Sequence, residues 1–303
     1  MGWTPNAVFS NTNAVVTERR RRPANGDHGV GSGWSTSTEA LTIKNRGASN
    51  WNGVLARVLT RQHVRAVYQP IVRLIGHQVT GYEALARPAN VADDGSVDEF
   101  FRTARQEGVI RDLDWLCRRA ALDGARGMAP GAFLSLNLNP DALQNADADA
   151  EALLQLLEAA DRPAATVVVE VVRPPSVVDV AALMRLLAPY RQRGARLAIA
   201  GVDVLEEPFL LASAEQPDFI KLSRPAVAAL EEPAARAFAE RCAERAARGG
   251  PVPIAEGIEL ESMARLVVAS GIQLGQGYLL GRPAAMDREG RLQAAVAPGE
   301  APA

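Results

Sequence analysis

The chain has 303 residues, of which 48% are hydrophobic and 22% charged, and its formal net charge at pH 7 is −2. This composition is typical of a globular protein, with enough residues for one large domain or two small ones. The near-neutral charge gives no electrostatic basis for binding nucleic acid, and no apolar run approaches the roughly 18 residues of a membrane-spanning helix, so we expect neither nucleic acid nor membrane as a partner.

Residues 1–50 are rich in Asn, Thr, Ser, Gly and Arg and show no hydrophobic periodicity. We expect a disordered N-terminal tail here, and the basic run at residues 19–22 reads as a solvated charge cluster. The first residues have no basic region followed by an apolar run, so they do not resemble a signal peptide. Cys117 and Cys242 lie far apart in helical sequence, as buried or half-buried thiols. This usage suits a reducing compartment, and we expect a cytoplasmic protein.

From residue 51 to residue 288, short apolar runs alternate with helical stretches rich in Ala, Leu and Arg. The first two runs, 64–74 and 77–87, are separated by a tight turn and predict an antiparallel pair. Six further strands are expected in the segments GAFLSLNLN, ATVVVEVV, ARLAIAG, PDFIKL, PVPIAEG and IQLGQGY. Helices are expected at 98–127, 141–160, 177–193, 205–215, 226–248 and 260–269, and a flexible tail at 289–303.

This alternation predicts the α/β class, with a (β/α)8 TIM-like barrel whose first strand is antiparallel. A doubly wound open sheet is the alternative fold. It is less favoured because no GxGxxG turn follows the first strand.

Polar side chains recur at the carboxyl ends of these strands, where the loops of a barrel converge. They are Gln69, Glu83, Arg87, Asn137, Glu170, Lys221, Glu256 and Gln276. Carboxylate and amide oxygens are the ligands that Mg²⁺ and Mn²⁺ prefer. No histidine falls at a strand end, which argues against zinc, and no GxSxG motif supports an acyl-enzyme.

The segment "YQPIVRLIGHQVTGYEALARP" resembles the opening signature of the EAL-domain family, the bacterial phosphodiesterases of cyclic di-GMP. "FLSLNLNP", "VVVEVV", "DFIKLS", "PIAEGIE" and "GQGYLLGRP" resemble later motifs of the family in the same order. The resemblance covers about residues 54–285 and implies a (β/α)8 barrel with an antiparallel first strand. It also implies a site in which two metal ions activate a water to give linear pGpG.

The resemblance assigns roles to individual residues. It implies Glu83, Asn137, Glu170 and Glu256 as metal ligands. It implies Gln69, Glu83, Leu85, Arg87, Asp114, Lys221 and Gln276 as nucleotide-binding residues. It also places Lys221 and Gln276 beside the attacking water, as catalytic residues.

The sequence departs from the family at one side of this site. Ala200 and Gly201 stand where the family has two adjacent aspartates that hold the metal pair. Arg173 replaces a glutamate and Ser223 an aspartate. Asp203 lies three residues beyond Ala200 and would need a rearranged loop to substitute. We therefore expect that the metal pair does not assemble and that Lys221 and Gln276 are vestigial as catalytic residues.

Three functions remain open. The first is a catalytically impaired cyclic di-GMP receptor that passes the signal to an unidentified protein partner. The second is an interaction module that no longer binds the nucleotide. The third is a weak phosphodiesterase, slowed by the loss of ligands from a two-metal clamp. No tightly bound cofactor is expected, and Mg²⁺ or Mn²⁺ would be required only for residual activity.

Overall fold

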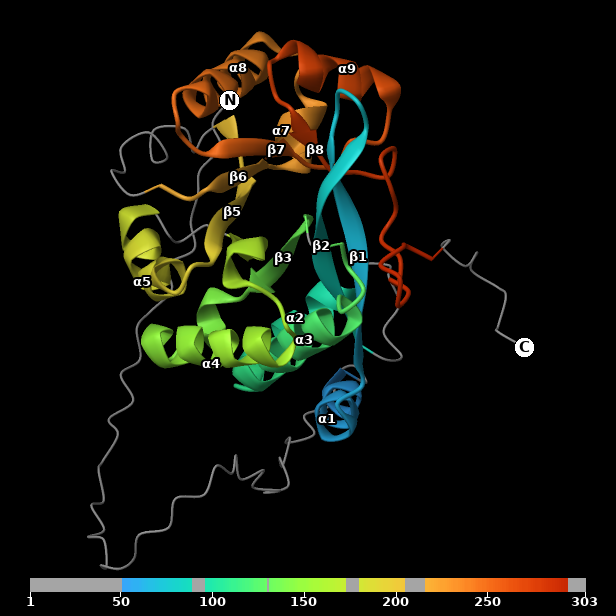
Figure 1. Cartoon of the computed structure of the whole chain (residues 1–303), viewed down its shortest axis with the longest axis vertical. Helices are drawn as coiled ribbons and strands as arrows, with labels where there is room; N and C mark the ends of the chain where they lie inside the picture. The colour runs from blue at the N-terminus through green and yellow to red at the C-terminus, as the bar shows by residue number, and fades with distance from the viewer. Residues whose placement is uncertain (1–50, 89–95, 130, 173–179, 205–215, 294–303) are drawn as a thin grey trace, which may run out of the picture. The chain divides into compact units, whose positions relative to one another are not determined.

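The computed structural model describes residues 51–88, 96–129, 131–172, 180–204 and 216–293 (Figure 1). The strands are β1 (Val64–Arg73), β2 (Gln78–Pro88), β3 (Phe133–Leu138), β4 (Val167–Val172), β5 (Arg196–Val202), β6 (Phe219–Leu222), β7 (Val252–Ala255) and β8 (Leu274–Gly275). The helices are α1 (Trp51–Arg61), α2 (Ser96–Gln106), α3 (Ile110–Gly124), α4 (Ala146–Ala159), α5 (Val180–Gln192), α7 (Arg224–Ala228), α8 (Pro233–Ala247) and α9 (Glu261–Ala269), with short 3-10 turns η1 (Pro140–Ala142) and η2 (Ala164–Thr166). The expected N-terminal tail, residues 294–303 of the expected C-terminal tail and the helix expected at 205–215 lie outside the described residues. Residues 289–293 are described, and Leu292 packs against the barrel core.

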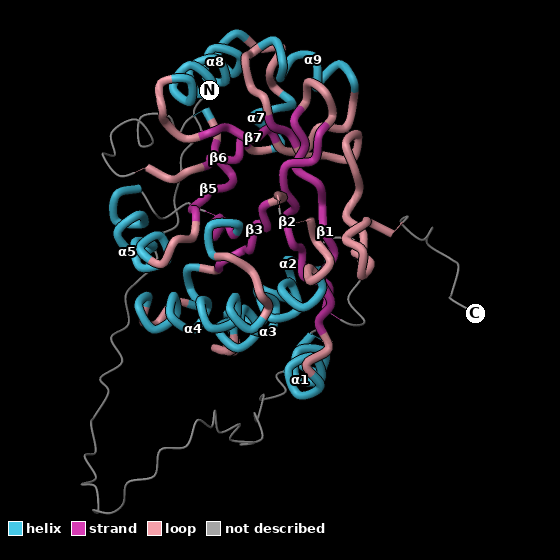
Figure 2. The backbone as a smooth tube through the Cα atoms, viewed as in Figure 1, coloured by secondary structure: helices cyan, strands magenta, loops and turns pink. Residues whose placement is uncertain are grey.

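The eight strands form a closed barrel in sequence order. β1 is antiparallel to both β2 and β8, and the other neighbouring strands are parallel. The barrel prediction is therefore confirmed, and the open-sheet alternative is wrong. Figure 2 shows the strands (magenta) inside a layer of helices (cyan).

Three helix predictions were too long, because the chain turns within them. The helix expected at 141–160 is the turn η1 followed by α4, whose N-cap is Asn145. The helix expected at 98–127 is two helices, α2 and α3, separated at Gly108, which has φ +73°. The helix expected at 226–248 is also two, α7 and α8, and Pro233 begins the second. A glycine with positive φ and a proline at the first helical position are ordinary helix boundaries.

The barrel interior has an apolar layer at the amino ends of the parallel strands. It consists of Ile71, Phe133, Val168, Ala198, Phe219, Ile254 and Leu274. The rings of Phe133 and Phe219 stack with their centroids 5.3 Å apart. β2 contributes Gly81 here, where an added Cβ would lie 2.6 Å from the Phe133 ring. Only a glycine leaves room for this ring.

The two-residue period of a strand places a second interior layer one step closer to the carboxyl ends. The steps are Gly81 to Glu83, Phe133 to Ser135, Val168 to Glu170, Ala198 to Ala200, Phe219 to Lys221, Ile254 to Glu256 and Leu274 to Gln276. The antiparallel β1 reaches the same layer in the opposite chain direction, from Ile71 back to Gln69. The apolar layer therefore lies directly beneath a polar one, and the strand pattern dictates both.

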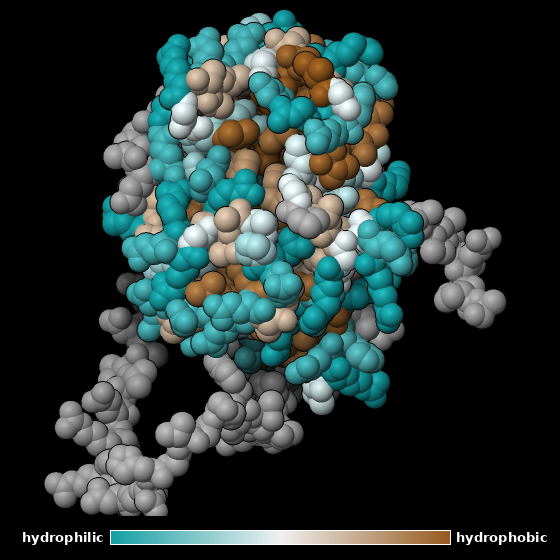
Figure 3. Space-filling model, viewed as in Figure 1, coloured by the Kyte–Doolittle hydropathy of each residue, from teal (hydrophilic) through white to brown (hydrophobic). Residues whose placement is uncertain are grey.

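A separate apolar cluster lies outside the barrel. It joins α1, α2 and α3 through Val54, Leu55, Val58, Phe100, Ala104, Val109, Ile110, Leu113 and Leu116. Both cysteines are free thiols, with Cys117 half-buried and Cys242 buried as expected. None of the described helices is both long and apolar enough to cross a bilayer. On the face shown in Figure 3, hydrophobic surface (brown) is broken into separate patches among hydrophilic side chains.

Candidate functional site

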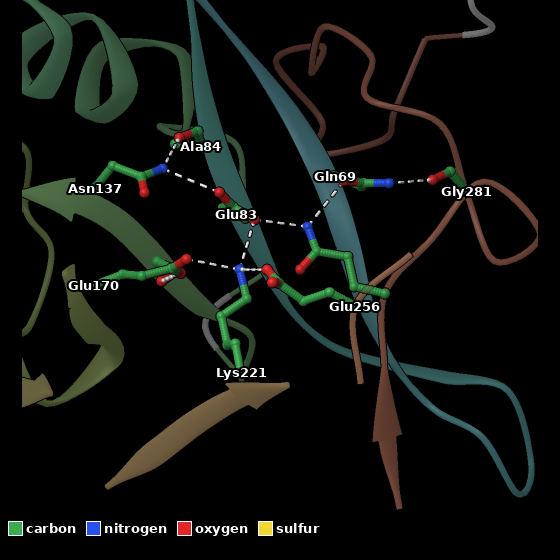
Figure 4. A network of polar contacts seen from close by, with 10 residues as sticks. Gln69, Glu83, Ala84, Asn137, Glu170, Lys221, Glu256 and Gly281 are labelled. Atoms are coloured by element: carbon green, nitrogen blue, oxygen red, sulfur yellow. Dashed lines mark hydrogen bonds and ion pairs between the residues drawn. The ribbon is translucent and has the colours of Figure 1, made fainter. Parts of the chain in front are cut away.

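Lys221 on β6 lies among three carboxylates at the carboxyl end of the barrel (Figure 4). Its Nζ is 2.8 Å from Glu83 Oε2, 2.7 Å from Glu170 Oε1 and 2.8 Å from Glu256 Oε1. The Lys221 side chain is 1% exposed, whereas that of Glu256 is 26% exposed. We call these four residues the lysine–carboxylate cluster. Each carboxylate comes from a different strand end, as the sequence predicts.

Neutral side chains hold the carboxylates of this cluster in place. Asn137 Nδ2 donates to Glu83 Oε1 at 3.0 Å, and Gln276 Nε2 donates to Glu83 Oε2 at 2.8 Å and to Gln69 Oε1 at 2.9 Å. Ser135 Oγ donates to Glu170 Oε2 at 2.7 Å. Gln69 in turn donates to the carbonyl of Gly281 at 3.1 Å. One connected network of hydrogen bonds and ion pairs therefore joins seven predicted site residues: Gln69, Glu83, Asn137, Glu170, Lys221, Glu256 and Gln276.

The pKa values of Glu83, Glu170 and Lys221 are shifted by burial and by the charges around them. Burial alone would raise the pKa of Glu83, but Lys221 and the donated hydrogen bonds outweigh it, and the pKa is lowered. Burial and the negative charge of Glu83 raise the pKa of Glu170 to about 7 despite its contact with Lys221. The pKa of Lys221 is raised well above its usual value because the three carboxylates outweigh the effect of burial. Lys221 is therefore a permanent cation.

The β5 position of this layer has no oxygen ligand. Ala200 is 4% exposed, and Gly201 follows it with φ +72°. Asp203 Oδ1 accepts from the amide of Val204 at 2.7 Å, and Oδ2 accepts from Ser223 Oγ at 3.5 Å. Asp203 is not one of the carboxylates that converge on the cluster.

The donor set of this layer suits a metal pair poorly. In the described part of the chain, Glu83, Glu170 and Glu256 form the only group of three acidic, histidine or cysteine side chains arranged to hold a metal ion, with ligand atoms within 4.8 Å of one another. An ammonium already contacts an oxygen of each. Mg²⁺ takes about six oxygen ligands in near-octahedral geometry, and β5 supplies no side-chain oxygen at residues 200 and 201. Among the described residues, β5 therefore adds no carboxylate at these positions to bridge two cations, and the three carboxylates present are already paired with an ammonium.

A cavity of about 680 Å³ lies beside the cluster. The ends of β2 and β3, the 3-10 turn η1, and helices α2 and α3 line it. Four predicted residues contribute to its wall: Leu85, Arg87, Asp114 and Asn137. Asn137 also bonds Glu83, so the cavity and the cluster share a wall. The sequence reasoning missed the wall residues contributed by α2 and η1: Val97, Asp98, Phe101, Arg102, Arg105, Pro140 and Asp141.

Asp114 has protein partners on both carboxylate oxygens. Oδ1 accepts from the amide of Asn139 at 3.1 Å, and Oδ2 accepts from Arg118. Burial raises its pKa, and the charge of Arg118 acts in the opposite direction. This carboxylate ties α3 to the end of β3. Its predicted contact with a guanine base stays a prediction.

Comparisons with known proteins agree with this fold. The family model described as the EAL domain matches residues 53–283. The chain is 24% identical over 235 residues to the probable cyclic di-GMP phosphodiesterase PdeN of Escherichia coli, covering 76% of this chain and 45% of that protein. The chain spans less than half the length of the curated relatives it matches.

Solved structures share the fold. The EAL domain of Xanthomonas citri FimX, in complex with cyclic di-GMP, has a TM-score of 0.67 at 16% identity and covers 78% of this chain and 94% of that one. A manganese and cyclic di-GMP complex of Klebsiella pneumoniae BlrP1 has a TM-score of 0.64 at 25% identity. That match covers 73% of this chain and 56% of BlrP1.

Proposed function

The chain belongs to the EAL domain family, and from that premise we propose that it acts in cyclic di-GMP signalling as a receptor that binds the nucleotide without turning it over. The observation that carries this proposal is the lysine–carboxylate cluster in a layer to which β5 contributes Ala200 instead of a carboxylate. Lys221 contacts an oxygen of each of the three carboxylates and offsets part of their charge. Relatives solved with cyclic di-GMP support the choice of ligand.

In this proposal the cavity binds the nucleotide, and the cluster forms the floor beside it. Arg87, at the end of β2, lines the cavity and would donate to a phosphate of the ligand. Asn137 connects the cavity wall to Glu83. The cluster carries one ammonium against three carboxylates, so recognition of the phosphates falls chiefly to the arginines of the wall. Gln276 donates to Glu83 and to Gln69, so in this proposal its role is to hold Glu83 in place and not to position an attacking water.

A divalent metal would supply a Lewis acid and a hydroxide near neutral pH. The residues at the end of β5 offer it no side-chain ligand, so we derive no hydrolytic step. We place the receptor in the cytoplasm, with residues 51–288 as its nucleotide-binding domain, and expect a protein partner downstream.

The decisive experiment titrates cyclic di-GMP into the protein by calorimetry, once in EDTA and once with Mn²⁺, and follows pGpG by chromatography. We expect binding in both buffers and no multiple turnover. Arg87→Ala should weaken binding by about ten- to a hundredfold, since a charge-assisted hydrogen bond contributes roughly 1.5–3 kcal/mol. Arg126→Ala is the matched control, because Arg126 pairs with Asp123 on the surface and is not a cavity residue.

The outcomes separate the three functions. Absence of binding in both buffers would refute the receptor and favour the nucleotide-independent interaction module. Clear multiple turnover to pGpG with Mn²⁺ would instead identify a weak phosphodiesterase.

A further inference from the structure

Helix α2 takes part in two different structures at once. Phe100 and Ala104 are fully buried in the apolar cluster with α1 and α3. Val97 and Phe101 line the cavity beside the lysine–carboxylate cluster. The helix is therefore a wall with the cavity on one side and α1 packed against the other.

Three aromatic rings connect α1 to the cavity. Trp51, the first residue of α1, meets the ring of Phe100 edge to face, with centroids 6.3 Å apart and planes at 69°. Phe100 meets Phe101 in the same manner, with centroids 6.1 Å apart and planes at 87°. Such edge-to-face pairs contribute beyond their buried area and fix the relative orientation of the rings. At the other end of α2, Asn52 Nδ2 donates to Glu107 Oε1 at 3.2 Å.

Phe101 is the one aromatic side chain among the described residues that line the cavity. It is partly exposed, whereas its neighbour Phe100 is fully buried. Small apolar residues from β2, β3 and α3 also line the cavity: Ala84, Ala86, Ala121, Leu136 and Leu138. A flat base and an exposed ring in such a space stack on one another, as proteins that bind unpaired nucleotides commonly show.

We propose that Phe101 stacks on a base of the bound nucleotide and that Trp51 positions Phe101 through the ring of Phe100. The inference rests on the proposed nucleotide-binding function and extends it. Phe101 is the residue in contact with ligand, and Trp51 acts at a distance. The first residue of α1 thereby senses whether the cavity is occupied, and a partner or chain segment acting on α1 changes the affinity for the nucleotide.

The first test compares the affinities of Phe101 variants for cyclic di-GMP by calorimetry in EDTA. Loss of base stacking on an aromatic ring weakens binding by about ten- to a hundredfold. We expect this loss in Phe101→Leu and near wild-type affinity in Phe101→Trp, which restores an aromatic face. Equal binding by wild type and Phe101→Leu would overturn the inference while leaving the receptor proposal intact. Absence of binding by the wild type would overturn both.

The second test concerns Trp51 and needs a control for lost packing. Leu59 is also on α1 and packs against the same apolar cluster, but it is not one of the three rings. Trp51→Leu should weaken binding several-fold, Trp51→Phe should restore it, and Leu59→Ala should bind as wild type does. Equal losses in Trp51→Leu and Leu59→Ala would show that α1 acts only as a general support and would refute the ring connection.

A spectroscopic measurement on unmutated protein avoids any folding defect. The chain has four tryptophans, and 5-fluorotryptophan labels all of them for ¹⁹F NMR. Comparison with Trp51→Phe assigns the Trp51 resonance. We expect this resonance to shift as cyclic di-GMP is added, in step with calorimetric saturation. A Trp51 signal that does not move while the ligand binds would contradict the proposed role of Trp51.

Discussion

Replacing Glu170 by Gln should make the protein more stable at pH 8 than the wild type, although it removes one of the carboxylates that contacts Lys221. Lys221 donates to Oε1 of Glu170 and Ser135 to Oε2. Glutamine keeps one oxygen, which can accept from Lys221, and its Nε2 can donate to the hydroxyl oxygen of Ser135. It removes a buried negative charge that faces Glu83 and Glu256. The sign of the effect therefore depends on whether ionisation of Glu170 is favourable in the folded state.

The shifted pKa of Glu170 determines the sign and the magnitude. Its pKa rises from 4.5 to about 7 on folding, chiefly by burial and by the charge of Glu83. A group with a raised folded-state pKa stabilises the fold below its unfolded pKa, and this contribution is lost as the pH rises through the folded pKa. A shift of this size corresponds to on the order of 3 kcal/mol. Between about pH 4.5 and 7 the wild type should therefore lose stability on the order of 3 kcal/mol that Glu170→Gln does not lose. The difference in free energy of unfolding, variant minus wild type, should rise by this amount over that range.

Urea unfolding of both proteins in EDTA, at intervals from pH 4 to 8, measures this difference. Glu83→Gln is the matched control, because Glu83 contacts the same lysine but has a lowered pKa. Its stabilising contribution is complete above pH 4.5 and is lost only as the pH falls below that value. From pH 5 to 8 the relative stability of Glu83→Gln should therefore rise less than that of Glu170→Gln, and only because loss of the Glu83 charge lowers the raised pKa of Glu170. A level curve for Glu170→Gln over the same interval would refute the assignment of a raised pKa to Glu170.

Three further substitutions test the packing and the cluster by urea or thermal unfolding. Lys221→Met leaves the buried carboxylates without their cation and should lower the free energy of unfolding by about 3–5 kcal/mol at pH 8; a change within 1 kcal/mol would refute the role of Lys221 as counter-ion. Leu55→Ala, at a fully buried position of α1, should cost about 2–5 kcal/mol, whereas Leu260→Ala at a 60% exposed position should stay within about 0.5 kcal/mol. Gly127→Ala places a Cβ 2.4 Å from the carbonyl oxygen of Arg288 and should cost about 1–3 kcal/mol, with Gly131→Ala, where nothing lies within 4 Å, as the neutral control.

The sequence was sufficient to predict the barrel and the polar layer within it, because both follow from a two-residue period. Phe133, Ser135 and Asn137 alternate with outward-facing leucines on β3, and this pattern places the last of them at the carboxyl end. The same reasoning brings Glu170 and Lys221 into the interior. Side chains that share a layer of a small barrel are close whatever their separation in sequence.

The two-residue period of the strands does not predict the contacts that helices make outside the barrel. Phe101 belongs to a helix whose hydrophobic pattern predicts burial, but the pattern does not say that Phe100 turns to α1 and Phe101 to the cavity. The sequence also predicts one continuous helix here, whereas the chain turns at Gly108 between α2 and α3. Arg105 and Asp141 are 45% and 60% exposed and form an ion pair across the cavity wall. No periodicity distinguishes such a pair from other surface charges.

The alanine at position 200 and the lysine at position 221 are best understood together. The buried layer contains three carboxylates and one ammonium, and Glu170 already has a raised pKa because it is buried and faces the negative charges of Glu83 and Glu256. A fourth carboxylate from β5 would raise the carboxylate pKa values further unless a divalent cation entered with it. A methyl group at Ala200 adds no charge and packs where β5 continues its interior row. With Ala200 at this position, the layer keeps three carboxylates, and Lys221 contacts an oxygen of each and so links three strand ends at the carboxyl end of the barrel.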